Sequence, residues 1–375
     1  MQYMLTNVFK NIIKYFIILI LLASCNVRKK NEFVIDGSID KLNNTFLYLK
    51  KYDGYGFEMI DSAYVNKGKF KFKGICYYPA LYVIEYNRNK KSLPIFVENS
   101  YIKVLINDFS ITKSQVLGST SHNLFSFFYK ALDSINNISL PLIGEYKDAI
   151  KKGDQIKASE LKTTIDEISS RQVSFIKDLV EKNPKSTVSL YLMSKYLSNT
   201  IPLNEFSDLY NKIDTSIKKS SYAYVVEDQL YSMFHTQIGE KCVDICLPDT
   251  LGNSLRLSNI KSYYILLYFW ASWDAASLKD VGQIISIKKK FGDHKIIIYS
   301  ISLDVKRVNW CASIDKYKMN WINVSDLKGW KSYAAKLFNV KSLPYYVLID
   351  KNGKIVDKNF NIDKLKLLIN YNSNK

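Results

Sequence analysis

The sequence predicts a chain in three parts: an all-β N-terminal domain, a helical middle segment and a C-terminal α/β domain. Between residues 33 and 118, short apolar runs are bounded by Gly, Asn, Asp or Pro, which is typical of strands joined by turns. Between residues 119 and 237, apolar residues recur three and four positions apart, which is typical of helices. From residue 238 to 375, continuous apolar runs alternate with helical segments, which predicts a mixed sheet covered by helices.

The first 25 residues predict export and attachment to a membrane. Lys10 and Lys14 precede an apolar run ending at Ala23, and this run is shorter than the ~20 residues that a membrane-spanning helix needs. Residues 1–24 are therefore interpreted as a signal peptide. The closing letters "LASC" resemble the lipobox of bacterial lipoproteins, and this resemblance implies cleavage before Cys25 and its acylation. The alternative is an ordinary secretory signal with an incidental cysteine.

A lipid on Cys25 would make the membrane a partner of the protein, with residues 25–32 as a short polar tether. We expect a protein of the cell envelope that faces the periplasm or the cell surface. The choice between inner and outer membrane stays open, and the sequence carries no signal for the oligomeric state.

The composition is basic without indicating a protein that binds nucleic acid. The formal net charge is +18, but hydrophobic residues make up 47% of the chain, which excludes a disordered polyelectrolyte. The lysines are spread along the whole chain, and no face alternates basic and aromatic residues. We therefore expect no nucleic-acid partner.

The N-terminal domain, residues 33–118, is expected to form an antiparallel sandwich or a partial barrel. Within it, the strict alternation of "KFKFKG" predicts one solvated and one buried strand face. The expected strands are "FVIDGSI", "TFLYLKKY", "MIDSAYV", "GKFKFKG", "ALYVIEY", "LPIFVEN" and "YIKVLIN".

Residues 119–237 are expected to form several helices that link the two β-containing parts. Asn183-Pro184 and Ile201-Pro202 should interrupt the series, because proline lacks the N–H that a helix interior needs. From residue 238 the predicted order is a hairpin, then β-α-β-α-β-β-α. Its buried strands are "YYILLYFWA" and "KIIIYSISLD", "GWKSYAAKLFNV" is expected to be helical, and Asn352-Gly353 indicates a type I′ turn.

The cysteines Cys76, Cys242, Cys246 and Cys311 are interpreted mostly as small buried hydrophobic residues. In an extended segment Cys242 and Cys246 would lie ~13 Å apart, too far for a disulfide. The spacing of cysteines and histidines fits no zinc site, and we expect no metal and no cofactor.

Five C-terminal segments, "IGEKCVDICLPDTLGNSLRLSNIK", "YFWASW", "SISLD", "WINVSDLKGW" and "AAKLFNVKSLPYYVLIDKNGKI", carry a family resemblance. Through them residues 238–375 resemble the thioredoxin-like domain of the TlpA/ResA type, which implies a thioredoxin fold. The resemblance implies that Leu343-Pro344 is the X–cis-Pro element facing the active-site helix. The N-terminal segments "DSAYVNKGKFKFKG", "IFVEN" and "GSTSHN" carry a second, less specific resemblance. Through them residues 33–123 resemble the small β domain of unknown function that precedes such domains in Gram-negative envelope lipoproteins.

The chemistry of that family resides in a Trp-Cys-x-x-Cys motif, and this chain lacks both sulfurs. Asp274 and Ser277 follow Trp273 at the two cysteine positions, separated by two alanines. Disulfide exchange needs a thiolate and a second sulfur, so the activity cannot be inherited at this site. Asp is a favoured N-cap, so we expect Asp274 to cap the following helix and Ser277 to hydrogen-bond within its first turn.

The sequence thus supports more than one functional class. The first hypothesis is a non-catalytic module in which Trp273, Asp274, Leu343 and Pro344 bind a peptide or an envelope protein. The alternative is a thiol–disulfide oxidoreductase that uses Cys242, Cys246 or Cys311. A third is a purely structural envelope component, in which Asp274 contributes only stability. Enzymatic activity is therefore left open, with no catalytic residue expected at positions 274 and 277.

Overall fold

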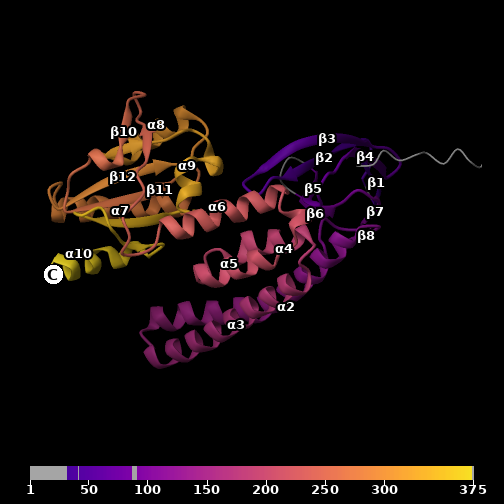
Figure 1. Cartoon of the computed structure of the whole chain (residues 1–375), viewed down its shortest axis with the longest axis horizontal. Helices are drawn as coiled ribbons and strands as arrows, with labels where there is room; N and C mark the ends of the chain where they lie inside the picture. The colour runs from indigo at the N-terminus through magenta and orange to yellow at the C-terminus, as the bar shows by residue number, and fades with distance from the viewer. Residues whose placement is uncertain (1–31, 41, 87–90, 374–375) are drawn as a thin grey trace, which may run out of the picture.

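In a computed structural model, which describes residues 32–40, 42–86 and 91–373, the N-terminal part consists of two four-stranded sheets. One sheet has the order β4-β1-β7-β8 and the other β3-β2-β5-β6 (Figure 1). Along β1 every second side chain is buried, as expected for a strand with one face on the core. The strands are β1 (Glu32–Ile39), β2 (Thr45–Tyr52), β3 (Phe57–Val65), β4 (Lys69–Ile75), β5 (Ala80–Tyr86), β6 (Lys91–Val97), β7 (Tyr101–Ile106) and β8 (Gln115–Leu117).

The expectation of a wholly antiparallel arrangement is wrong at one pair. β1 and β7 run parallel, with Val34 opposite Tyr101 and Ile39 opposite Ile106. β6 belongs to the other sheet, so the chain crosses from that sheet to this one between β6 and β7, and β7 then pairs with β1. Strand periodicity in a sequence shows which face is buried but carries no information on the direction of the neighbouring strand.

The middle segment is helical, as expected, and begins with a long helical hairpin that extends away from the sheets (Figure 1). The first helix passes through Pro141 without ending. Pro141 and Asn137, whose carbonyl loses its intrahelical N–H partner, are both exposed, so water can hydrate that carbonyl. The helices are α2 (Thr120–Lys152), α3 (Gln155–Lys182), α4 (Thr187–Leu192), the π-helical η1 (Met193–Leu197), α5 (Leu203–Lys212), the 3-10 helix η2 (Thr215–Ile217) and α6 (Ser221–His235).

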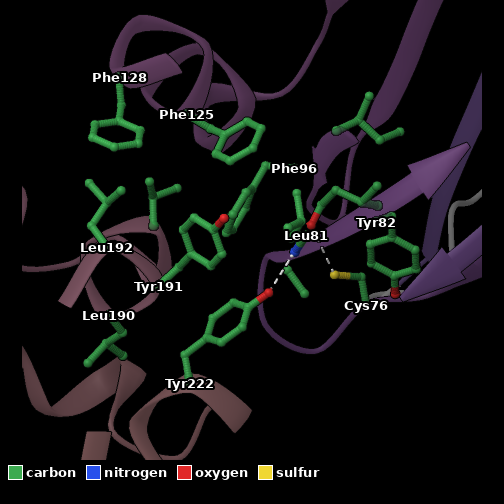
Figure 2. Close-up of a cluster of buried hydrophobic side chains, with 14 of the residues drawn as sticks. Cys76, Leu81, Tyr82, Phe96, Phe125, Phe128, Leu190, Tyr191, Leu192 and Tyr222 are labelled. Atoms are coloured by element: carbon green, nitrogen blue, oxygen red, sulfur yellow. Dashed lines mark hydrogen bonds between the residues drawn. The ribbon is translucent and has the colours of Figure 1, made fainter. Parts of the chain in front are cut away.

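One continuous hydrophobic core joins the β-sheets to these helices. In Figure 2, Phe96 of β6, Phe125 of α2, and Tyr191 of α4 lie together between the strands and the helices. Tyr222 reaches from α6 to the backbone of β5, where its hydroxyl accepts the N–H of Leu81 at 2.9 Å (Figure 2). The two parts therefore share their buried surface and should fold as one unit.

The C-terminal part has a five-stranded sheet of order β13-β12-β11-β14-β15, preceded by the small hairpin β9-β10. All seven residues of β11 are buried; Leu267 and Phe269 pack on one face, and Tyr268 and Trp270 on the other. The elements are β9 (Cys246–Pro248), β10 (Ser254–Arg256), η3 (Leu257–Asn259), β11 (Tyr264–Trp270), α7 (Ala275–Phe291), β12 (Ile296–Ser302), α8 (Arg307–Tyr317), β13 (Ile322–Val324), η4 (Gly329–Lys331), α9 (Tyr333–Leu337), β14 (Tyr345–Asp350), β15 (Ile355–Lys358), η5 (Ile362–Lys364) and α10 (Leu365–Ser373).

Three local features of this part differ from the sequence prediction. The short strand β13 was not predicted, and the expected single helix over "GWKSYAAKLFNV" is split into η4 and α9 at Ser332. The β14–β15 turn is not type I′, because only Gly353 has a positive φ, 76°, whereas that turn needs two such residues. The Gly353 N–H instead donates to Asp350 O, as in a type I turn followed by a left-handed glycine.

Side-chain contacts fix the C-terminal part against the rest of the chain. The Lys331 ammonium lies 2.7 Å from the Asp53 carboxylate in the β2–β3 loop. Asn339 donates its amide to Asn199 Oδ1 at 2.6 Å, and α6 packs against α9. The observed architecture confirms the predicted fold class: N-terminal β-sheets, a helical middle and a C-terminal α/β domain.

Within the described part of the chain, no helix combines the length and the apolar character that a membrane span requires. The predicted signal peptide, Cys25 and nearly all of the predicted tether lie outside the described residues.

The shared core gives a first testable prediction. Replacing Tyr222 with Phe removes the hydroxyl and leaves the buried Leu81 N–H without a partner, so we expect the free energy of unfolding to fall by about 1–3 kcal/mol. Guanidinium unfolding followed by circular dichroism measures the change. Tyr224→Phe is the matched control, since Tyr224 is 57% exposed on the same helix and should change stability by less than about 0.5 kcal/mol. Equal stability of the two variants would contradict the assigned role.

Candidate functional site

Asp274 occupies the N-cap of α7, at the turn where the chain leaves the central strand β11. Its backbone is extended, with φ −99° and ψ 105°, as N-cap residues require. Its Oδ2 accepts the Ser277 N–H at 2.7 Å and the Ser277 hydroxyl at 2.6 Å. The predicted cap and the predicted local hydrogen bond of Ser277 are therefore confirmed.

This arrangement places a carboxylate where the helix favours negative charge. The first N–H groups of a helix have no intrahelical acceptor, and the helix dipole is positive at this end. Asp274 is partly buried and Ser277 is fully buried, so the hydroxyl points into the protein and is occupied by the cap. Neither side chain is left free to act as a nucleophile.

A second carboxylate, which the sequence analysis did not identify, holds the preceding loop. Asp304 lies two residues after the end of β12 and is 1% exposed. It accepts the Ser272 N–H at 2.9 Å, the Ser272 hydroxyl at 2.5 Å and the Ser302 hydroxyl at 2.7 Å. Because Ser272 immediately precedes Trp273, Asp304 positions the exposed tryptophan. A polar residue at the end of the second parallel strand was the signal that could have revealed it.

Two tyrosines lie beneath the start of α7 and were also not predicted. Tyr268 donates to the Ser277 carbonyl at 2.7 Å, and Tyr346 donates to Asp280 Oδ2 at 2.8 Å. Their rings stack with centroids 5.4 Å apart. Burial, followed by the negative charge of Asp280, raises the pKa of Tyr268, and burial with the neighbouring Tyr268 raises the pKa of Tyr346. Both stay protonated at neutral pH, so neither can accept a proton there.

An aromatic surface borders the cap. Trp273 is 56% exposed, and its ring lies 6.1 Å from that of Trp330 in η4. Trp330 was missed by the sequence analysis because it is distant along the chain. Leu343 and Pro344, both partly buried, are joined by a cis peptide bond, as the resemblance implied. Leu343 and Trp330 pack against the same core cluster, which includes Phe269 and Phe338.

The four described cysteines are all free, and none belongs to the turn between β11 and α7. Burial raises the pKa of the Cys76 thiol to about 11 and that of Cys242 to about 12. Both are therefore protonated at neutral pH and poor nucleophiles. Cys311 is partly buried on α8, whereas Cys246 is exposed at β9, which corrects the expectation that the cysteines are mostly buried.

Among the described residues, no group of three or more His, Cys, Asp or Glu side chains is arranged to hold a metal ion. The carboxylates at the site, Asp274 and Asp304, each accept hydrogen bonds from serine donors.

Comparisons with known proteins divide the chain into two matched regions. Residues 33–125 match a domain of unknown function, and residues 262–355 match a thioredoxin-like family. A thiol-disulfide oxidoreductase ResA of Bacillus cereus is 25% identical over 122 residues, which cover 32% of this chain and 69% of that protein.

Two solved structures are also similar. A thiol-disulfide oxidoreductase from Bacteroides fragilis is 28% identical, with 34% of this chain and 99% of that chain covered and a TM-score of 0.32. A thioredoxin-like protein from Bacteroides caccae is 17% identical, with 56% and 82% covered and a TM-score of 0.39.

The C-terminal part of this chain is thus a thioredoxin-like domain related to ResA/TlpA-type thiol-disulfide oxidoreductases, and it is preceded by an N-terminal domain of the unknown-function family.

Proposed function

We propose that this is a lipid-anchored protein of the cell envelope whose thioredoxin-like domain binds polypeptide and is redox-inactive at the usual site. The observation that supports this most directly is the cap of α7. Asp274 and Ser277, which the resemblance aligns with the two cysteines of the family motif, are hydrogen-bonded to each other. The helix start is stabilised, but it holds no group that can form a mixed disulfide.

The surroundings of the cap support the same interpretation. A thiol–disulfide exchange site needs an accessible thiolate and a group that can take up a proton. Ser277 is fully buried, and the hydroxyls of Tyr268 and Tyr346 are protonated hydrogen-bond donors at neutral pH. These groups support a site that holds the start of the helix but carries no atoms for disulfide exchange.

The exposed aromatic rings beside the cap support the binding of polypeptide. Trp273 presents a large ring to solvent, and Asp304 fixes the loop before it. Trp330 lies beside it, and the next residue, Lys331, is paired with Asp53 of the N-terminal domain. The neighbouring rings of Trp273 and Trp330 suit the apolar side chains of an extended polypeptide, because aromatic anchors carry much of the energy at such interfaces.

The anchor and the location rest on the first 25 residues. Two lysines, a short apolar run and the letters "LASC" support cleavage before Cys25 and lipid attachment there. A lipid would hold the binding surface near the membrane, where exported polypeptides pass.

The second candidate is a thiol–disulfide oxidoreductase that uses a non-standard cysteine. One observation favours it: Cys246 is exposed and therefore accessible to a disulfide. In the described structure no other cysteine is bonded to it.

The first test measures redox activity directly. We expect the purified full-length protein to reduce insulin no faster than background, because neither Asp274 nor Ser277 carries sulfur. The double variant Asp274→Cys, Ser277→Cys supplies two thiols at the helix N-terminus and is expected to gain measurable reductase activity. Turnover by the unaltered protein that disappears in Cys246→Ser would establish the second candidate instead.

The second test addresses polypeptide binding. We expect reduced, carboxymethylated insulin B chain to bind the full-length protein, and Trp273→Ala to weaken that binding by about tenfold or more, since truncating a tryptophan anchor often costs ~2 kcal/mol. Fluorescence anisotropy of the labelled peptide measures the affinity. Leu251→Ala, which truncates an 82% exposed side chain in the β9–β10 hairpin, should leave it unchanged. Absence of binding by the unaltered protein would favour the purely structural alternative.

The third test addresses the anchor. Cells that express the full chain and are fed radiolabelled palmitate should incorporate label into the protein, and Cys25→Ser should abolish this incorporation. Cys76→Ser is the matched control, because that thiol is buried in the folded protein and is not expected to carry lipid. Equal labelling of the Cys25→Ser variant and the unaltered protein would overturn the lipoprotein interpretation.

A further inference from the structure

A pocket of about 490 Å³ opens at the end of β11 opposite to Trp273. It lies between η3, the start of β11 and the turn that joins β14 to β15. Its volume is within the range of natural sites for small organic ligands. Nothing in the cap of α7 contributes to it, so it requires a separate explanation.

The floor of this pocket is apolar. It is formed by buried Leu257, Ile265 and Ile349, with partly buried Ile260 and the thiol of Cys242 beside them. Burial raises the pKa of Cys242 to about 12, so the thiol is uncharged and adds to the apolar lining. Water in such a pocket makes few hydrogen bonds with the floor, which favours its displacement by a hydrocarbon group.

The rim of the pocket is basic. Lys241, Lys261 and Lys351 line the opening and are exposed. Within the described residues, none of these three lysines forms an ion pair with a carboxylate. Their observed contacts are neutral: Lys261 donates to the Ser258 carbonyl, and Lys351 donates to the Tyr263 hydroxyl, each at 3.4 Å.

The two acidic residues of the pocket do not cancel this charge. Asp244 is paired with Arg256 at 2.9 Å and also accepts the Ser258 hydroxyl at 2.9 Å. The Oδ1 of Asp350 accepts the backbone N–H groups of Asn352 and Lys354 and thereby holds the turn. Three lysines therefore face one carboxylate that has no cationic partner, which leaves an excess of two positive charges at the mouth.

We infer that this pocket binds a small amphipathic anion, with its acidic group at Lys241, Lys261 and Lys351 and its hydrocarbon body on the apolar floor. Charge-assisted hydrogen bonds to a carboxylate or phosphate are stronger than those to a neutral group, so the lysines select for an anion. The apolar floor selects against inorganic anions, which would lose hydration there without compensation. The concave shape favours a free molecule over a lipid that remains in a bilayer.

Calorimetric titration of the full-length protein with octanoate tests this inference. The protein is held in phosphatidylcholine nanodiscs, and empty nanodiscs provide the blank. We expect saturable binding of one octanoate per chain. Acetate, which lacks the apolar body, and 1-octanol, which lacks the charge, should each bind at least about tenfold more weakly.

Charge reversal locates the site. The double variant Lys261→Glu, Lys351→Glu should weaken octanoate binding by at least about tenfold, whereas Lys316→Glu, an exposed residue of α8 in the same domain, should leave it within about twofold. Thermal unfolding checks that both variants are folded. Absence of saturable binding, or equal affinity in the two variants, would overturn the inference. So would retention of the protein on phosphatidylglycerol vesicles through these lysines without any octanoate binding.

Discussion

The capped start of α7 is the constraint on which the C-terminal domain depends. The helix α7 begins shortly after the buried central strand β11 ends, and the first N–H groups of a helix have no intrahelical acceptor. A thiolate can occupy that position, and so can a carboxylate, because both are anions near the positive end of the helix. Asp274 stabilises the turn through two hydrogen bonds to Ser277, and an N-cap aspartate contributes ~0.5–2 kcal/mol relative to alanine. A carboxylate is therefore sufficient to stabilise this turn without a sulfur atom.

The remainder of the chain is organised around one shared core, and the C-terminal domain is attached to it by contacts of a different kind. Tyr222 and Phe96 belong to a cluster that includes both sheets and the middle helices. The attachment of the thioredoxin-like domain includes polar contacts, such as Lys331 with Asp53, which are partly exposed. Exposed ion pairs contribute little, about 0–1 kcal/mol, so the packing of α6 against α9 must supply much of the stability of this junction.

The sequence predicted the features that depend on local patterning. The buried strand β11, the N-cap Asp274 and the helical middle segment all follow from hydrophobic period or from a favoured residue type. Features that join residues distant in the sequence could not be predicted. They include the parallel pairing of β1 with β7 and the contact of Trp330 with Trp273. The continuation of α2 through Pro141 also escaped prediction, because it depends on exposure of the freed carbonyl, which only the folded structure reveals.

The two surfaces proposed to bind ligands lie at opposite ends of β11, and this placement limits how they can influence each other. Every residue of the strand is buried, and its neighbours β12 and β14 are paired with it along almost its whole length. Coupling between distant sites needs an element with two alternative arrangements, and a fully packed central strand does not provide one. An amphipathic anion near Ile265 and a polypeptide at Trp273 should therefore bind independently, each using one end of the same rigid sheet.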